Sequence, residues 1–392
     1  SEAEMFRNFF EQVEAADALG YGTAWVAEAH LSTEVQKRHE RPVVPHWKGE
    51  IGLNTDVFQL AHQVFRRTKR IDVGSAVTNI VCNGGPVAAA ERIAAFAALH
   101  GLDPDEQRKL RFGFSAGRFQ FMNRAYGVQP RDELEAAAWP ALRGQVFWEA
   151  CEVLLRLLNG EAIAGADVRP TVLTRANFRS DEDWARVQAA AKAQGRTDLT
   201  QISIPRRWDF DVLRIVPREW RRELVDLVLG SHDPMLQQAV NRWRPVKVFN
   251  LSITRPEVID ATHARMSAAY HPDGGAWERG HMPRTVMVFL NAEAGLDAQA
   301  QRTAAQAEAR KALSAYWTAL EGTLDPEKVA RASDNAIVGD PESVARQVAD
   351  RFHPDDRLML WFDFFNHDSD RVIRNMTAFW EQVAPRVAEL QA

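Results

Sequence analysis

The sequence predicts an α/β fold built on a parallel sheet, of the (β/α)8 barrel type. Two observations predict it: short apolar runs alternate with helical patterns, and most connections between them are short. The chain has 392 residues, 46% of them hydrophobic, which is enough for one large α/β domain. We therefore expect residues 1–392 to form a single barrel domain with an insertion at residues 159–222.

Seven segments have the composition of buried strands, since they are short apolar runs bounded by glycine or polar residues. They cover residues 23–27, 71–80, 110–114, 224–230, 246–253, 285–291 and 357–362. A TIM (β/α)8 barrel has eight strands, and the first predicted element here is a helix at 5–19. The barrel interpretation therefore predicts that a β-strand precedes Ser1 in the complete gene product.

Helical patterns, with apolar residues three and four positions apart, separate these strands. They cover residues 5–19, 54–67, 86–99, 180–194, 234–243, 256–270, 297–320 and 368–390, with further helices after 132 and 340. Asn54, Thr254 and Asp340 are the expected N-caps. The stretch 159–222 interrupts the alternation. Its length predicts an insertion that forms a lid or wall beside the site, or a structural excursion at a dimer surface.

Composition excludes several classes of function. The net charge is −5, with acidic and basic residues interspersed, so the sequence offers no basic field for nucleic acid or anionic lipid. Apolar runs stay well below the roughly 18 residues of a membrane helix. Cys82 and Cys151 match no metal-binding spacing, and a reducing cytoplasm is the expected location. No metal-binding motif is present in the sequence.

The segment 109–127 predicts a binding site. Its apolar run at 110–114 is followed by Ser115 and Gly117, by the cations Arg118 and Arg124, and then by a helix. Small residues, cations and a helix start at the carboxyl end of a parallel strand are typical of an anion or cofactor site.

Four segments in order resemble the bacterial luciferase-like flavin-dependent monooxygenases. They are LGYGTAWVAEAH at 19–30, TKRIDVGSAVTNIV at 68–81, LRFGFSAGRF with RAYGV at 110–128, and the C-terminal VGDPESVARQV, RLMLWFDF and VAPRV. The resemblance implies a TIM barrel that binds reduced FMN, or a deazaflavin in some branches. It also implies that reduced flavin adds dioxygen to form a C4a-peroxide, which oxidises an organic substrate.

The resemblance also implies positions for the flavin ring. Ala76 and Val77 map to a bulge or cis peptide beneath the isoalloxazine, where backbone must lie close to a flat ring. Ser115 maps to the position beside the reactive C4a, and its small side chain leaves room there. The family's arginine just after it maps to Ala116, so Arg118, two residues later, is either its substitute or an exposed charge.

Two further positions map to the flavin phosphate. Arg131, followed by Glu135, matches a family arginine that binds the phosphate, and Ser231, with His232 and the helix start after it, matches the second phosphate contact. Backbone N–H groups at a helix start together with an arginine suit a dianion. From the residues alone, Ser231 is equally an ordinary helix cap.

The segment Glu28-Ala29-His30 departs from the family, which often has Glu-His-His here. His30 and Glu28 are the candidate catalytic residues, with His30 as a general base or hydrogen-bonding group. The alternative is a structural histidine tied to Glu28. Ala29 replaces a histidine that serves luciferase chemistry, which argues against aldehyde oxidation with light emission.

Other polar residues lie in the second half of the chain, several of them near predicted strand ends. They are Asn250, His263, His271, His281, Asp363 and His367. Asn250 and Asp363 are the ones placed where barrel chemistry occurs, whereas His263 lies within a helical pattern and is expected to be structural.

The resulting prediction is a two-component, FMN-dependent monooxygenase that a separate flavin reductase supplies. Its expected substrate is a small or medium apolar molecule, since 12 tryptophans are available to line a pocket. The alternatives are a deazaflavin-dependent oxidoreductase on the same barrel and a non-catalytic flavin-binding relative. Family members often form dimers, and the helices at 54–67 and 86–99 are the candidate interface.

Overall fold

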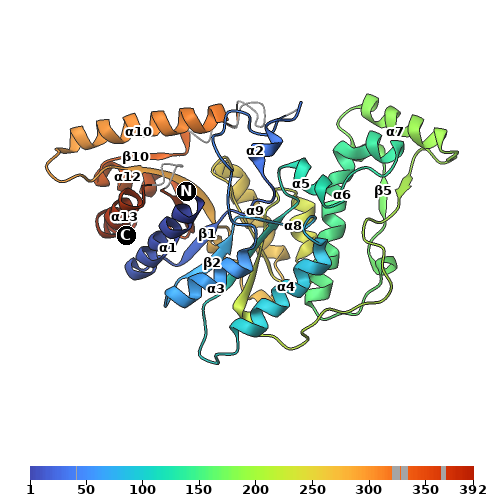
Figure 1. The fold of residues 1–392 in the computed structure, drawn as a ribbon, viewed down its shortest axis with the longest axis horizontal. Helices are drawn as coiled ribbons and strands as arrows, with labels where there is room; N and C mark the ends of the chain where they lie inside the picture. Colours follow the sequence, from blue (N-terminus) through green and yellow to red (C-terminus); the bar gives the residue numbers. More distant parts are fainter. Residues whose placement is uncertain (41, 320–326, 328–333, 363–367) are drawn as a thin grey trace.

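The computed structural model describes residues 1–40, 42–319, 327, 334–362 and 368–392. In these residues parallel strands form a curved sheet, with helices along its outer side (Figure 1). The strands follow one another as β1 (Thr23–Val26), β2 (Asp72–Ser75), β4 (Leu110–Ser115), β7 (Val225–Leu229), β8 (Val246–Val248), β9 (Arg284–Leu290) and β11 (Leu358–Trp361). All seven strands predicted from the sequence are confirmed.

The sheet curves strongly enough for strands far apart in this order to meet. The rings of Trp25 on β1 and Phe249 on β8 are 5.9 Å apart between centroids. Both belong to one apolar cluster with Val228 and Met359, on the face that the helices do not cover. The sheet therefore encloses an interior, as in a barrel, although within the described residues no ladder pairs β1 with β11.

Most helices lie where the sequence patterns predict them, but the short helices at residues 33–36 and 120–125 were not predicted. They are α1 (Glu2–Leu19), α2 (Thr33–Gln36), α3 (Val57–Arg67), α4 (Gly85–His100), α5 (Gln120–Ala125), α6 (Glu133–Leu158), α7 (Asp181–Ala193), α8 (Pro234–Val240), α9 (Pro256–Ala269), α10 (Ala298–Ala319), α12 (Pro341–Arg351), α13 (Ser369–Ala378) and α14 (Ala384–Gln391), with a π-helical turn at Phe379–Val383. Among the described helices, none has the length and apolar character needed to span a membrane.

The predicted caps are partly confirmed. Asp340 accepts from the backbone N–H of Ser343 and starts α12, as expected. Asn54 does not cap α3, because its side-chain amide donates to the Ala27 carbonyl at 3.0 Å and Asp56 takes the cap position. Thr254 likewise lies one residue before the N-cap of α9, and its hydroxyl accepts from a backbone N–H of the preceding loop.

The insertion at 159–222 forms a small unit of its own on the outer side of α6 (Figure 1). Its strands β5 (Thr171–Leu173) and β6 (Ile202–Ile204) pair in antiparallel fashion, and α7 packs against α6. Two other short strands extend the parallel sheets: β3 (Thr78–Asn79) pairs with β4, and β10 (Ile337–Gly339) pairs with β9.

The amino-terminal end of the barrel interior is closed by charged side chains. Arg111 on β4 donates to Asp226 on β7 at 2.7 Å, to Asp72 on β2 and to Thr23 on β1. Lys247 on β8 donates to the same carboxylate of Asp226 at 2.8 Å. Five adjacent strands are thereby joined through side chains as well as through backbone hydrogen bonds.

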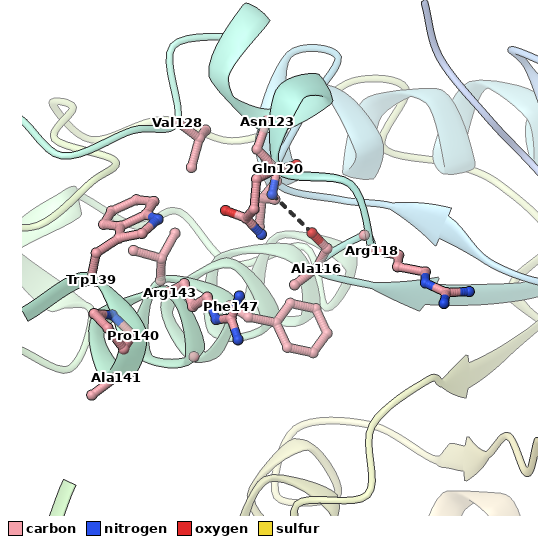
Figure 2. Close-up of a pocket in the computed structure, with 14 residues that line it drawn as sticks. Ala116, Arg118, Gln120, Asn123, Val128, Trp139, Pro140, Ala141, Arg143 and Phe147 are labelled. Carbon is pink, nitrogen blue, oxygen red and sulfur yellow. Dashed lines mark hydrogen bonds between the residues drawn. The ribbon is translucent and has the colours of Figure 1, made fainter. Parts of the chain in front are cut away.

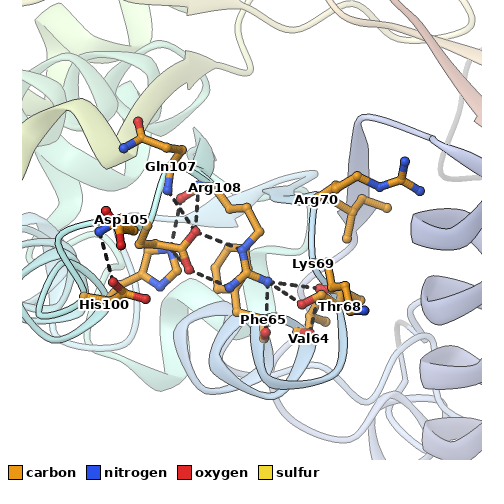
Figure 3. A network of polar contacts seen from close by, with 12 residues as sticks. Val64, Phe65, Thr68, Lys69, Arg70, His100, Asp105, Gln107 and Arg108 are labelled. Atoms are coloured by element: carbon orange, nitrogen blue, oxygen red, sulfur yellow. Dashed lines mark hydrogen bonds and ion pairs between the residues drawn. The ribbon is translucent and has the colours of Figure 1, made fainter.

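A second charged network joins α3 and α4 to the loop before β4 (Figure 3). The Arg108 guanidinium donates to the carbonyls of Phe65 and Thr68 at 2.9 and 2.7 Å, which satisfies acceptors at the end of α3. It also pairs with the Glu106 carboxylate, while the ring of His100 hydrogen-bonds the Arg108 carbonyl at 2.9 Å. Burial alone would raise the pKa of Glu106, but the hydrogen bonds and charge of Arg108 outweigh it and lower the pKa to about 2.

This lowered pKa predicts a pH-dependent contribution of Glu106 to stability. A carboxylate whose pKa is lower in the folded state stabilises the fold above its unfolded pKa of 4.5, and the contribution disappears as the pH falls toward 2. We expect Glu106→Gln to destabilise the protein at pH 6 but to lose most of this effect at pH 3. Urea unfolding of both proteins at the two pH values measures the difference, and an equal loss at both would contradict the assignment.

Candidate functional site

The carboxyl ends of β2, β4 and β7 meet where Val77, Ser115 and Gly230 lie together, and these three residues form the floor of the site. A Cβ atom built on Gly230 would lie 3.4 Å from both the Ser115 side chain and the Val77 side chain, so these three positions adjoin. A Cβ on Gly113 would lie 2.0 Å from the carbonyl oxygen of Ser75, which leaves only glycine possible there. The peptide bond between Ala76 and Val77 is cis, in agreement with the backbone feature that the family resemblance implies.

The candidate pair Glu28 and His30 lies beside this floor, in the loop after β1. The His30 Nε2 atom is 3.1 Å from the Glu28 carboxylate, and the two side chains are 5% and 3% exposed. The other Glu28 oxygen accepts from the backbone N–H of Val57 and from the Thr78 hydroxyl, each at 3.2 Å. The structure thus brings the predicted pair together and adds Thr78, which the sequence analysis did not identify.

A cavity of about 400 Å³ opens between the loop after β4 and residues 139–147 of α6. Its walls include Ala116, Trp139, Arg143 and Phe147, and Figure 2 shows the last three projecting from α6. The volume lies in the range of small-molecule and cofactor sites. Apolar and aromatic walls with a cation suit a ligand that combines a flat ring and an anion.

Arg143 is the cation of this cavity that the sequence analysis missed. Its side chain is exposed and has no hydrogen-bond or ion-pair partner within the described part of the chain. The spacing of Trp139, Arg143 and Phe147, four residues apart, places all three on one face of α6. That spacing was the sequence signal that could have identified Arg143 as part of the site. It was missed because an arginine within a helical pattern is usually a solvated surface residue.

Arg118 also contributes to the wall of the cavity, but Figure 2 shows its side chain extending away from Trp139. Desolvation lowers the pKa of Arg118, and Tyr316 lies near enough to influence it. The side chain therefore lies toward the aromatic residues of α10. Ser115 itself accepts from the backbone N–H of Gly117 at 3.1 Å, which fixes the turn that follows β4.

Each of the three guanidinium nitrogens of Arg131 donates to a protein group. Its Nε donates to Glu135 at 2.7 Å, and its terminal nitrogens donate to the carbonyls of Arg206 and Pro205 at 2.9 and 2.6 Å. Glu135, buried at 3% side-chain exposure, also accepts from Arg207. Arg131 therefore links the insertion to α6, and a flavin phosphate bound at Arg131 would compete with these acceptors. Binding of the flavin phosphate by Arg131 stays a prediction.

Ser231 and His232 follow β7, as predicted. The Ser231 hydroxyl accepts from the backbone N–H of Asp233, and Asp233 rather than Ser231 caps α8. Trp148 on α6 donates to the Asp233 carboxylate at 3.0 Å, which ties this loop to the helix that carries Arg143. His232 is exposed and its ring lies 3.4 Å from the Thr254 hydroxyl.

The remaining polar candidates have structural surroundings. His263 accepts from the Trp277 indole at 3.1 Å, as expected for a structural histidine, and the rings of His271 and His281 accept local backbone N–H groups. Asn250 is 1% exposed, and its carboxamide has no hydrogen-bond partner among the described residues. Asp363 and His367 lie outside the described residues. Within the described part of the chain, no cluster of three potential metal ligands occurs.

The family model for luciferase-like monooxygenases matches residues 1–180 of the chain. This match confirms the resemblance that the sequence segments indicated. No curated protein sequence matches the chain significantly.

Solved structures similar to this one include two monooxygenases and an F420-dependent dehydrogenase. The monooxygenase RslO1 from Streptomyces bottropensis has a TM-score of 0.60 and 18% identity, with 97% of this chain and 93% of that chain covered. The FMN complex of the oxygenating constituent of 3,6-diketocamphane monooxygenase from Pseudomonas putida has a TM-score of 0.57 and 12% identity, covering 99% and 94%.

A third similar structure is an F420-dependent secondary alcohol dehydrogenase in complex with an F420–acetone adduct. Its TM-score is 0.56 at 13% identity, covering 96% of this chain and 94% of that chain. At such identities the likeness establishes the fold alone. It confirms the predicted luciferase-like (β/α)8 barrel class.

Proposed function

Residues 1–180 match the family model of the luciferase-like monooxygenases, and on that basis we propose that the chain is an FMN-dependent monooxygenase that oxidises a small or medium organic substrate. The observation that carries the proposal is the floor of Val77, Ser115 and Gly230 next to the cavity of α6. A flat ring needs close access to backbone, and the small side chains on this floor leave room for it.

The residues present fit a flavin mononucleotide. We assign the ring to the floor of small residues, with Ser115 beside its reactive carbon, and the phosphate to the end of the cavity near Arg143. A guanidinium with no protein partner among the described residues is the donor that a phosphate dianion requires. Ser231, His232, Arg118 and Arg131 remain proposed second contacts to the cofactor.

Glu28 and His30 are the proposed proton-handling pair. Reduced flavin, when bound, supplies the two electrons for the reaction with dioxygen. The role of the protein in this proposal is to position the substrate, to exclude water and to hold a proton at His30. Glu28 fixes the orientation of the His30 ring. Trp25 and Phe249 close the interior beneath the floor, so we expect an apolar surrounding for the reacting groups.

The test is anaerobic binding followed by oxygen mixing. We expect the purified protein to bind reduced FMN and to change the rate at which air-saturated buffer reoxidises it, as measured by flavin absorbance in stopped flow. Tighter binding of a deazaflavin than of FMN would instead support the second candidate function, a deazaflavin-dependent oxidoreductase. The similarity to the F420-dependent dehydrogenase favours this candidate. Failure to bind either cofactor would overturn the proposal.

We further propose a separate reductase as the source of reduced flavin, and a homodimer. Leu99 and Leu102, at the end of α4, are 61% and 76% exposed, which supports an interface on this helix. Sedimentation of the wild-type protein and of a Leu99→Glu variant tests the dimer, since only the wild type should associate.

A further inference from the structure

A chain of buried hydroxyl groups extends from the Glu28–His30 pair into the barrel wall. The Thr78 hydroxyl is 3.2 Å from the Glu28 carboxylate, and the Ser75 hydroxyl is 2.7 Å from that of Thr78. Ser75 and Thr78 are 0% and 6% exposed. Neither residue can therefore exchange these partners for water without moving the ends of β2 and β3.

The direction of each hydrogen bond in this chain follows from the chemistry of the groups. An ionised carboxylate only accepts, so Thr78 donates its single hydroxyl proton to Glu28. Ser75 must then donate to Thr78, because Thr78 has no second proton to offer. The backbone N–H of Val57 donates to the same Glu28 oxygen, at 3.2 Å. One carboxylate oxygen thus receives two fixed donors, and the other is left for His30.

The His30 ring meets that second oxygen with Nε2, at 3.1 Å. Because the carboxylate cannot donate, Nε2 carries a proton, and in the neutral ring Nδ1 then carries the lone pair. Within the described residues Nδ1 has no hydrogen-bond partner. The ring packs edge-on to Tyr126, with 6.1 Å between centroids, and Tyr126 is 40% exposed. Nδ1 is therefore the ring nitrogen that no hydrogen bond within the described residues occupies.

We propose that Thr78 and Ser75 are positioning residues that hold the Glu28 carboxylate and thereby fix His30 in its Nε2–H tautomer, with Nδ1 ready to accept a proton. When His30 takes a proton at Nδ1 from an O–H or N–H group, Nε2–H stays on Glu28 and the imidazolium is paired with a carboxylate. The identity of that ligand rests on the proposed function, whereas the tautomer is a property of the protein alone.

Few other charged or titratable groups face this pair. Tyr126 approaches from the end of α5. Cys82, from the segment before α4, lies near Glu28, and burial followed by the Glu28 charge raises the pKa of its thiol to about 12. Arg92 of α4 also faces Cys82 and Tyr126, but it is paired with Asp56 at 2.6 Å. Cys82 is therefore neutral at physiological pH, which leaves Glu28 as the group that decides the His30 tautomer.

Glu28→Gln is the most direct test, because glutamine has the shape of glutamate but only one of its two terminal polar atoms can accept a hydrogen bond. Thr78 and Val57 require an acceptor at the inner position, so the amide oxygen must lie there and the NH2 group must face His30. Its donation to Nε2 forces the proton to Nδ1. We therefore expect the tautomer of His30 to invert in Glu28→Gln, measured by ring 15N chemical shifts in histidine-labelled protein without flavin.

The protein has 11 histidines, so a His30→Gln spectrum identifies the resonances. Thr78→Ser should keep the wild-type tautomer, whereas Thr78→Val should give a mixture. Thr303→Val, which replaces an exposed hydroxyl on α10, is the matched control and should change nothing. A melting curve for each variant shows whether it folds. An Nδ1–H tautomer in the wild type, or an unchanged tautomer in Glu28→Gln, would overturn the proposal.

Activity provides the second measurement. With reduced FMN, oxygen and a substrate, Glu28→Gln should lower kcat by about 100-fold, the scale of a misplaced general base. Thr78→Val should lower it by about fivefold to tenfold, the scale of one hydrogen bond. If the wild type shows no flavin-dependent turnover, the proposed function fails while the tautomer result stands. An inverted tautomer with unchanged kcat would remove His30 from the reaction.

Discussion

Replacing Asp226 by alanine is expected to destabilise the protein by about 3 to 5 kcal/mol, the usual cost of removing one partner from a buried ion pair. Burial opposes ionisation of Asp226, but Lys247 and Arg111 outweigh it and hold the pKa of this carboxyl below its usual range. Without the carboxylate, Lys247 would remain enclosed with Arg111 as its neighbour. Urea unfolding at neutral pH, compared with the wild type, measures the loss.

The same site allows a rescue experiment. Replacing both Asp226 and Lys247 by leucine removes the carboxylate and one cation together, so the double variant should recover much of the lost stability. Glu14→Ala is the matched control, because Glu14 is 49% exposed and lies 3.7 Å from Arg67 on the surface. Its effect should stay below about 1 kcal/mol. Equal losses for Asp226→Ala and Glu14→Ala would show that the interior network contributes no stability.

The ion-pair network around Asp226 illustrates why the strands could be predicted from the sequence but the contacts inside the barrel could not. The outer face of each strand carries apolar residues such as Phe112 and Phe114, both 0% exposed, and these make the strand recognisable in the sequence. Arg111, in the same strand, looks like an isolated surface charge. Only the pairing of β4 with β7 brings it opposite Asp226, more than 100 positions away, so no local pattern could reveal the pair.

Three short strands were also missed. The strands β5, β6 and β10 have three residues each, too few for a period to be recognised, whereas β8, of equal length, lies in the longer apolar run at 246–253. The predicted cap Asn54 is two residues from the true cap Asp56, because the amide found a better acceptor in the neighbouring strand end. The sequence analysis named Asn54 alone, and the tertiary contact of its amide leaves the cap to Asp56.

The candidate site was also predictable only where its residues lie close together in the sequence. The proximity of Glu28 and His30 was predictable, since they lie two residues apart after a strand. Thr78, which completes their network, lies 50 residues further along the chain and comes from a different strand. Arg131 was selected because it matches a family arginine, but folding gives it partners in the insertion. Arg143 has none among the described residues, and only the structure distinguishes the two.

The distinction between these arginines leads to the second large effect. We expect Arg143→Ala to weaken the binding of FMN by about 10- to 100-fold, the scale of charge-assisted hydrogen bonds to a phosphate. Riboflavin has the same ring without the phosphate, so its affinity should stay unchanged. Fluorescence titration of both flavins against both proteins separates loss of the phosphate contact from damage to the ring site.

Arg131→Ala is the informative comparison for this experiment. Its guanidinium holds Glu135 and two carbonyls of the insertion, so its loss should lower the unfolding midpoint while leaving the preference for FMN over riboflavin intact. Arg143→Ala should do the reverse, since the side chain has no protein contact of this kind to lose in the described residues. If Arg131→Ala instead abolishes the preference and Arg143→Ala retains it, the phosphate lies at Arg131, as the family resemblance first implied.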